Sequence, residues 1–497
     1  MNTSTVDRVE GTRDLPPQTW AAQRAVCSLM LDAIAGFGYQ GVGVPLIEAV
    51  DLYERRAGAR VVSQLLEFPN RGGQILCLRP ELTASVARAW AADRRRQCPA
   101  RLMYSGSAFR RGESGGGDIE QFTEVGAELI GVGGPAGDAE VIALAYAALS
   151  QAQLWERRIV LGHLGLLSDV LAQLGLSPRA RSILLEGLAD LRAPGGGIES
   201  VREDALRKYR AAAPQDLGWG PGLDRDRLDA LVASIAGGGE DPIGARSRDQ
   251  IVDRLAAKFE RGDETERLNQ AFDLLGELAT CSGPADSALA STGMVLAQRG
   301  IDAGPLAEID RLVKLLRASG EDIDGLEFDP ALGRGLQYYT GLVFDVYCRS
   351  ADQWLAVGGG GRYDDLLSAI SPQAPTPAVG LSFRIENLLE AGGERLTGSG
   401  QRSPADVLVL ADGDVGAALA LARSLRRAWL RTRLGDSDQP VEPQIDRARR
   451  EGLAAAVQVG PRDGDEVVLH DVAGGAQRRV PPADVAALVR ELMAEDK

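Results

Sequence analysis

The sequence FRRGESGGGDIEQFTEVGAELIG, at Phe109–Gly131, decides the fold that we expect for this chain. Arg110 and a second arginine precede a loop with three glycines at 115–117. Glycines let the backbone approach a ligand closely, and arginines suit an anion. The stretch therefore predicts a strand–loop–strand unit of the kind that holds a phosphate, with strands near Arg101–Ser105 and Thr123–Ile130.

The charges that follow the glycines oppose this use. Asp118, Glu120, Glu124 and Glu128 come directly after the loop. A carboxylate about 4 Å from a phosphate charge costs roughly 4 kcal/mol at the effective dielectric of a protein surface. The loop is therefore interpreted as the scaffold of a nucleotide site that no longer favours a nucleotide.

Composition limits the class of protein. The chain has 497 residues, which predicts two or three domains, and a net charge of −15, the wrong sign for coating nucleic acid. Its five cysteines form no CxxC pair, so we expect reduced structural thiols. The N-terminus lacks an apolar signal region and no run of 18 apolar residues follows. We expect a soluble, cytoplasmic protein with no membrane partner.

Changes in residue pattern and composition along the chain predict several structural segments. Strand and helix patterns alternate through residues 1–176, breaker clusters separate helical runs over 177–325, and strand patterns return at 326–391. A linker rich in glycine and serine spans 392–404, and 405–497 has the pattern of a small α/β domain. We expect 177–325 to be a mainly helical insertion into an α+β core.

Three further segments hold charged or aromatic groups where they could meet a ligand. LRPELT at 78–83 places Glu81 and Thr83 at a strand-to-helix junction, where both residues also suit the first turn of a helix. GRGLQYYTG at 333–341 sets Arg334 between glycines, and its two tyrosines would present one phenol to each face of a strand. A glycine run in VGGGGRYD at 357–364 predicts either a flat strand under a ligand or a bulge.

Sequence motifs of several common catalytic and metal-binding sites are absent from the chain. The chain contains no GxxxxGK[ST] phosphate loop and no HExxH pair. Its two histidines, His163 and His470, are too few for most histidine-based metal sites. We expect no metal and no cofactor.

Taken in order, these segments resemble the histidyl-tRNA synthetase family, and the resemblance spans Val9–Glu390. It is carried by the order and spacing of six motifs: GTRDLPP at 11–17, LRPELTA at 78–84, the 109–131 stretch, GRGLQYYTG at 333–341, GGRYD at 360–364 and PAVGLSF at 377–383. The resemblance implies a class II aminoacyl-tRNA synthetase fold, in which helices flank a six-stranded antiparallel sheet. It also implies a dimer formed near Pro45 and a tail similar to the family's anticodon-binding domain.

The resemblance implies a pocket for L-histidine. The matching residues are Glu81, Thr83, Arg110, Glu124, Glu128, Arg334, Tyr338 and Tyr339. One of them departs from the family, because Glu124 stands where the synthetases have glutamine. Carboxylates can pair with the ammonium and imidazole groups of such a ligand.

The nucleotide half of the implied site departs further. Asp118 and Glu120 replace basic residues of the second motif, Gly112 replaces a carboxylate, and Asn387 of FRIENL (383–388) replaces an arginine that grips ATP. Amino-acid activation must stabilise charge on the transferring phosphoryl groups, and these clamps are missing. We expect no catalytic residue in this chain.

This pattern resembles one branch of the family, the regulatory subunits of short-form ATP phosphoribosyltransferase, which opens histidine biosynthesis. LGHLGL at 161–166 is similar to a strand common in that branch. The resemblance implies a hetero-oligomer with the catalytic subunit, allosteric feedback by histidine, and no tRNA partner. Two alternatives stay open: an active histidine–tRNA ligase, and another synthetase-like protein that binds an amino acid.

Overall fold

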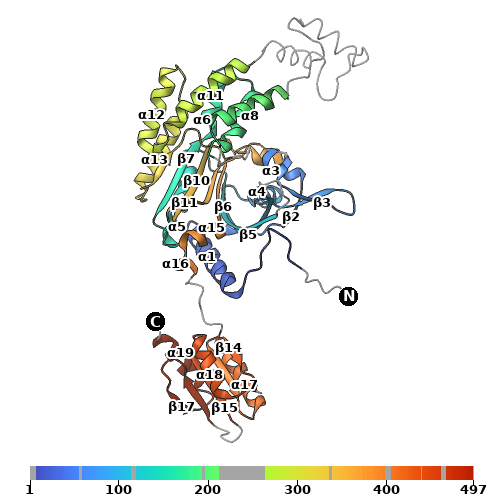
Figure 1. Ribbon diagram of the computed structural model, residues 1–497, viewed down its shortest axis with the longest axis vertical. Helices are drawn as coiled ribbons and strands as arrows, with labels where there is room; N and C mark the ends of the chain where they lie inside the picture. Colours follow the sequence, from blue (N-terminus) through green and yellow to red (C-terminus); the bar gives the residue numbers. More distant parts are fainter. Residues whose placement is uncertain are drawn as a thin grey trace. The chain divides into compact units, whose positions relative to one another are not determined.

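The computed structural model describes residues 7–54, 59–112, 119–192, 196–211, 264–334, 338–372, 374–397, 405–437, 439–460 and 466–495 (Figure 1). Contacts divide the chain into two compact units, Met1–Thr397 and Gly398–Lys497. Asp118 and the glycines at 115–117 lie outside the described residues, as do 212–263 of the predicted insertion and 398–404 of the predicted linker.

The first unit is built on a nine-stranded mixed sheet with the order β1-β5-β6-β12-β11-β10-β7-β9-β8. Within this order, the six strands β5-β6-β12-β11-β10-β7 each pair antiparallel with their neighbours in the set. This confirms the six-stranded antiparallel sheet that the family resemblance implies. The strands are β1 (Gln40–Gly41), β5 (Ala100–Arg111), β6 (Ile119–Ile130), β7 (Arg157–His163), β8 (Gly283–Pro284), β9 (Leu326–Phe328), β10 (Leu342–Ser350), β11 (Gln353–Arg362) and β12 (Ala378–Arg384).

A second, three-stranded sheet lies in the same unit, with the order β2-β4-β3. Its strands are Ile47–Ala49 (β2), Leu66–Pro69 (β3) and Ile75–Leu78 (β4). The helix α4 (Thr83–Ala92) follows β4 after four residues, so the LRPELT segment is the strand-to-helix junction that its sequence predicts.

The remaining helices of the first unit fall into two groups along the chain. The first comprises α1 (Pro17–Ala35), α2 (Asp51–Glu54), α3 (Ala59–Ser63), α5 (Gly134–Gln151), α14 (Leu366–Ile370), α15 (Ile385–Gly392) and α16 (Glu394–Thr397). The second comes from 164–318: α6 (Leu164–Gln173), α7 (Pro178–Gly187), the 3-10 helix η1 (Leu188–Arg192), α8 (Ile198–Ala211), α11 (Thr265–Ala279), α12 (Ala285–Gln298) and α13 (Leu306–Ala318).

The two faces of β6 differ because side chains alternate along a strand. Val125, Ala127 and Leu129 are fully buried in the main hydrophobic core with residues of α1 and α5. The intervening positions carry Glu120, Phe122, Glu124 and Glu128, which turn to the opposite face of the sheet. The alternation therefore puts an apolar face against helices and a charged face toward the candidate site.

Helices from the segment 177–325 share this core. Leu184 of α7, Phe272 of α11 and Leu312 of α13 are buried in the same cluster as the sheet residues Leu161 and Phe344. The described part of the segment thus packs on the first unit through apolar contacts. No helix among the described residues is long and apolar enough to cross a membrane.

The second unit has its own α/β sheet, with the order β14-β13-β15-β16-β17. β13 runs parallel to β14 and β15, whereas β16 and β17 continue antiparallel. Its elements are β13 (Val407–Ala411), α17 (Val415–Arg427), β14 (Thr432–Leu434), α18 (Val441–Arg450), β15 (Ala455–Val459), β16 (Val467–Asp471), β17 (Gln477–Val480) and α19 (Val485–Glu495). Val409, Leu425 and Val457 are buried in a separate core.

Candidate functional site

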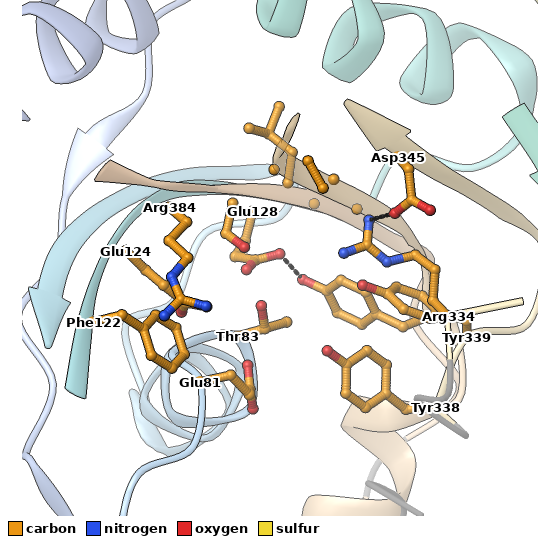
Figure 2. A pocket seen from close by; sticks show the side chains of 18 of the residues that line it. Glu81, Thr83, Phe122, Glu124, Glu128, Arg334, Tyr338, Tyr339, Asp345 and Arg384 are labelled. Atoms are coloured by element: carbon orange, nitrogen blue, oxygen red, sulfur yellow. Dashed lines mark hydrogen bonds and ion pairs between the residues drawn. The ribbon is translucent and has the colours of Figure 1, made fainter. Parts of the chain in front are cut away.

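A cavity of about 310 Å³ opens on the charged face of the large sheet (Figure 2). All eight residues that the sequence predicted for a ligand pocket line it, although they come from segments far apart in the chain. They are Glu81, Thr83, Arg110, Glu124, Glu128, Arg334, Tyr338 and Tyr339. Further lining residues include Phe122, Asp345, Tyr363, Arg384 and Asn387, together with the glycines at 358–360 and 380.

Glu128 lines the cavity and is completely buried. Tyr104 donates a hydrogen bond of 3.0 Å to its Oε1, and the Tyr363 hydroxyl donates to its Oε2. Burial nevertheless raises the pKa of Glu128 to about 8, because an isolated carboxylate loses its hydration there. Such a group binds a proton when the cavity is empty and favours a cation when it is filled.

Glu81 and Glu124 are the two other buried carboxylates that line the cavity. Burial first, and the neighbouring charge of Glu124 second, raise the pKa of Glu81 to about 7. The Ala84 N–H donates to Glu81 at 3.0 Å, so Glu81 also caps the first turn of α4. The Leu82 N–H donates to Glu124 at 3.3 Å, and burial raises the pKa of Glu124 as well. The capping role and the cavity position of Glu81 therefore coexist.

Arg334 forms the opposite wall, where its Nη1 lies 3.1 Å from Oδ1 of Asp345 (Figure 2). The same nitrogen donates to the Phe344 carbonyl. A Cβ at Gly359 would lie 1.7 Å from this nitrogen, so glycine is required there for the guanidinium to lie on β11. The glycine run also adjoins a β-bulge, where the β10–β11 register shifts between Val346 and Tyr347.

The sequence interpretation of Tyr338 and Tyr339 was wrong in one respect. The two phenols do not point to opposite faces of a strand, because residues 338–340 are irregular and precede β10. Both tyrosines line the cavity, with ring centroids 4.7 Å apart and a tilt of 60° between the planes. Tyr338 is also 3% exposed and packs in an apolar cluster, so one residue serves both core and cavity.

On the other side of the site lie Glu120 and Asn387, which the sequence assigns to the nucleotide half. Glu120 forms an ion pair with Arg384, the last residue of β12. The guanidinium carbon of Arg384 lies 4.4 Å from the centroid of the Phe122 ring. Asn387 donates from Nδ2 to the Ala356 carbonyl at 2.7 Å. Glu120 and Asn387 therefore both have protein partners, and of the two only Asn387 lines the cavity.

Several lining residues, among them Phe122, Asp345, Tyr363 and Arg384, were missed as ligand-site residues from the sequence. Asp345 and Arg384 sit at the pocket-facing positions of β10 and β12, which the strand alternation could have identified once the registers were known. Tyr363 lies in the quoted GGRYD motif, and its role became visible only through its hydrogen bond to Glu128.

The arrangement favours a ligand with a positive charge. Arg334 and Arg384 have ion-pair partners in Asp345 and Glu120, which leaves three buried glutamates facing Arg110. Arg110 donates from Nε to the Pro80 carbonyl at 2.9 Å, so part of its hydrogen-bonding capacity is already used. Buried carboxylates are stable when paired with a cation that also donates hydrogen bonds. An ammonium group would meet this need.

Comparisons with known proteins identify the family. A sequence model of histidyl-tRNA synthetase matches residues 11–213 and 242–388. The chain belongs to the histidyl-tRNA synthetase family. Among its relatives, the ATP phosphoribosyltransferase regulatory subunit of Moorella thermoacetica is 32% identical over 446 residues, which cover 89% of this chain and 95% of the relative.

Synthetases of the same family are also similar over nearly the whole chain. The histidine–tRNA ligase of Pyrococcus abyssi is 26% identical over 494 residues, covering 98% of this chain and 99% of the relative. A solved structure described as an ATP phosphoribosyltransferase regulatory subunit/histidyl-tRNA synthetase from Bacillus halodurans C has a TM-score of 0.63 at 22% identity and covers 92% of this chain and 98% of its own. That structure confirms the class II synthetase fold.

Proposed function

We propose that this chain is a non-catalytic regulatory subunit of ATP phosphoribosyltransferase and that its cavity binds L-histidine. The observation that carries the proposal is the contrast between the two walls of one cavity. The carboxylates and tyrosines expected to hold an amino acid line the cavity, whereas Glu120 is paired with Arg384 outside the lining and Asn387 donates to the Ala356 carbonyl. The cavity thus keeps a cation-binding half without a set of free phosphate clamps.

The chemistry of histidine matches the charged half. Its ammonium group, and its imidazole N–H groups, would donate to Glu81, Glu124 and Glu128, and Thr83 offers a hydroxyl beside them. Arg110 would meet the ligand carboxylate, since its guanidinium lines the same cavity as the carboxylates. The extra negative charge at Glu124 favours the protonated form of the imidazole.

Similarity to a regulatory subunit over 89% of the chain supports the partner. We propose that the chain associates with the short-form catalytic subunit and couples histidine binding to its activity. Coupling of this kind is a free energy shared between two sites, so it requires no chemistry in this chain. We further propose that tRNA is not a partner.

Co-expression with a short-form catalytic subunit tests the association. We expect the two proteins to co-purify as a hetero-oligomer and the catalytic subunit to change its rate of phosphoribosyl transfer in the complex. Separate elution on size exclusion at micromolar concentrations, with an unchanged rate, would refute the proposed partner.

A homodimer is part of the same proposal. Leu46 and Ile47, at the start of β2, are 49% and 47% exposed although both are large and apolar. This patch adjoins Pro45, where the resemblance implies a dimer contact. We expect light scattering to give twice the monomer mass for the wild type and the monomer mass for Leu46→Glu.

The second candidate function is that of a histidine–tRNA ligase, which is favoured by similarity to such ligases over 98% of the chain. Histidine-dependent exchange between ATP and pyrophosphate decides between the two. We expect no exchange above background, whereas turnover at the rate of an authentic ligase would establish the second function.

A further inference from the structure

The ring of Phe122 is the aromatic surface on the wall opposite Arg334, and two arginines lie on it. The guanidinium carbon of Arg384 is 4.4 Å from the ring centroid, and that of Arg110 is 5.2 Å from it. Figure 2 shows Arg384 extending across the ring at this wall.

The sheet explains this arrangement. β6 runs between β5 and β12, so Arg110 and Arg384 reach the ring from different neighbouring strands. Arg384 is paired in register with Glu124, and its side chain extends diagonally to Phe122 and Glu120. Glu120 and Phe122 are two residues apart and therefore lie on the same face of β6. The ion pair with Glu120 thus holds the guanidinium against the ring.

An aromatic face inside a polar cavity is a stacking surface for a flat ligand ring. A planar guanidinium uses that same surface, because it is attracted to the ring and stacks on it. While Arg384 remains paired with Glu120, a ligand ring would have to displace it. The ion pair also neutralises Arg384, so its charge offers little attraction to an incoming phosphate.

We propose that Arg384 is a specificity-determining residue that closes this wall of the cavity to flat heteroaromatic ligands such as purine nucleosides by covering Phe122. The inference deepens the proposed function, on which it rests for the identity of the cavity as a histidine site. Histidine would then be admitted to the carboxylate half, while the ring face stays covered by the protein itself.

Arg384→Ala in the full-length chain tests this directly, with adenosine as the probe. Adenosine is uncharged, so a change in its affinity reports access to the ring and not the loss of a positive charge. We expect calorimetric titration to show at least about tenfold tighter adenosine binding in the variant, equivalent to ~1.4 kcal/mol. Arg395→Ala on α16, an exposed arginine of the same unit, should bind adenosine as the wild type does.

A second substitution identifies the surface that binds the probe. Adding Phe122→Leu to Arg384→Ala should remove the gain, because the stacking surface is then lost. Equal adenosine affinity in the wild type and Arg384→Ala would overturn the proposal, and so would a gain that survives Phe122→Leu. Arg384→Lys keeps a cation for Glu120 but not the planar group, and the same test applies to it if the alanine variant does not fold.

The result of the adenosine test can be distinguished from the result of the test of the proposed function. Histidine titration of the wild type tests the ligand of the cavity, and adenosine titration of Arg384→Ala tests the covered ring. A tenfold adenosine gain without histidine binding would refute the histidine site and leave the role of Arg384 intact.

Discussion

Tyr104 donates a hydrogen bond of 3.0 Å to Oε1 of Glu128, and both residues are completely or almost completely buried beneath the cavity. The phenol fixes the carboxylate without neutralising it. Burial raises the pKa of Glu128 to about 8, so without a ligand the group holds a proton near neutral pH. A ligand cation would favour its ionised form, at a position that Tyr104 has already set. This pair is the physical basis for the proposed histidine site.

Glu128→Gln should weaken histidine binding by at least tenfold. Hydrogen bonds to charged groups contribute about 1.5–3 kcal/mol, and the amide keeps the shape of the side chain but not its charge. Calorimetric titration with histidine measures the effect. Glu266→Gln, on the exposed side of α11, is the matched control, and equal affinities in the two variants would exclude Glu128 from the site.

The stability of the unliganded protein should depend on the protonation of Glu81 and Glu128. Their pKa values are raised to about 7 and about 8 in the folded state, from 4.5, so the folded state binds more protons. Their contribution is therefore fully present below about pH 4.5 and is lost as the pH rises through 7 to 8. Urea unfolding between pH 5.5 and 8.5 measures the slope.

Glu81→Gln isolates this effect from the general acidity of the chain. We expect its free energy of unfolding to fall less steeply with pH than that of the wild type, because one raised carboxyl is gone. A slope identical to the wild type would show that Glu81 is ionised at neutral pH in the empty cavity.

Histidine binding should release protons near pH 7.5. A ligand ammonium favours the ionised carboxylates, so protons held by Glu128 in the empty cavity leave when it is filled. Calorimetry in buffers of different ionisation enthalpy counts them. Fewer protons should leave in Glu128→Gln, and an unchanged number would assign the release to other groups.

Gly380→Ala should disturb the site by crowding alone. A Cβ at this position would lie 1.7 Å from Oε2 of Glu128 and 2.9 Å from the Ala127 carbonyl. Overpacking of this kind costs about 1–3 kcal/mol. We expect denaturant unfolding to show a loss in that range, together with weaker histidine binding. Gly304→Ala, which meets no atom closer than 3.9 Å, is the control and should change neither quantity.

The sequence anticipated the fold and the composition of the cavity to different extents. Ordered motifs located both halves of the sheet, and the eight predicted residues do meet at one cavity. The sequence could not predict which strands pair. Arg384 lies next to Glu124 only because β12 pairs with β6, which is more than 250 residues away in the chain. The orientation of Tyr338 was wrong because a strand was assumed where the backbone is irregular. Long-range register, not local pattern, decides such contacts.

The strands themselves show the same limit. The residue pattern predicted a strand at Thr123–Ile130, yet β6 begins at Ile119. The strand is longer because β5 also pairs with the polar residues Glu120 and Gln121. β17 was not predicted at all, since three of its four residues are exposed and polar and its pairing with β16 holds it in place.

Phosphoribosyl transfer by the complex with the short-form catalytic subunit, measured as histidine is increased, tests the central claim most directly. We predict that histidine changes the rate and that Glu128→Gln shifts the half-maximal response to at least tenfold higher histidine, while the complex still assembles. The same response curve in the wild type and Glu128→Gln would contradict the claim that this cavity senses histidine.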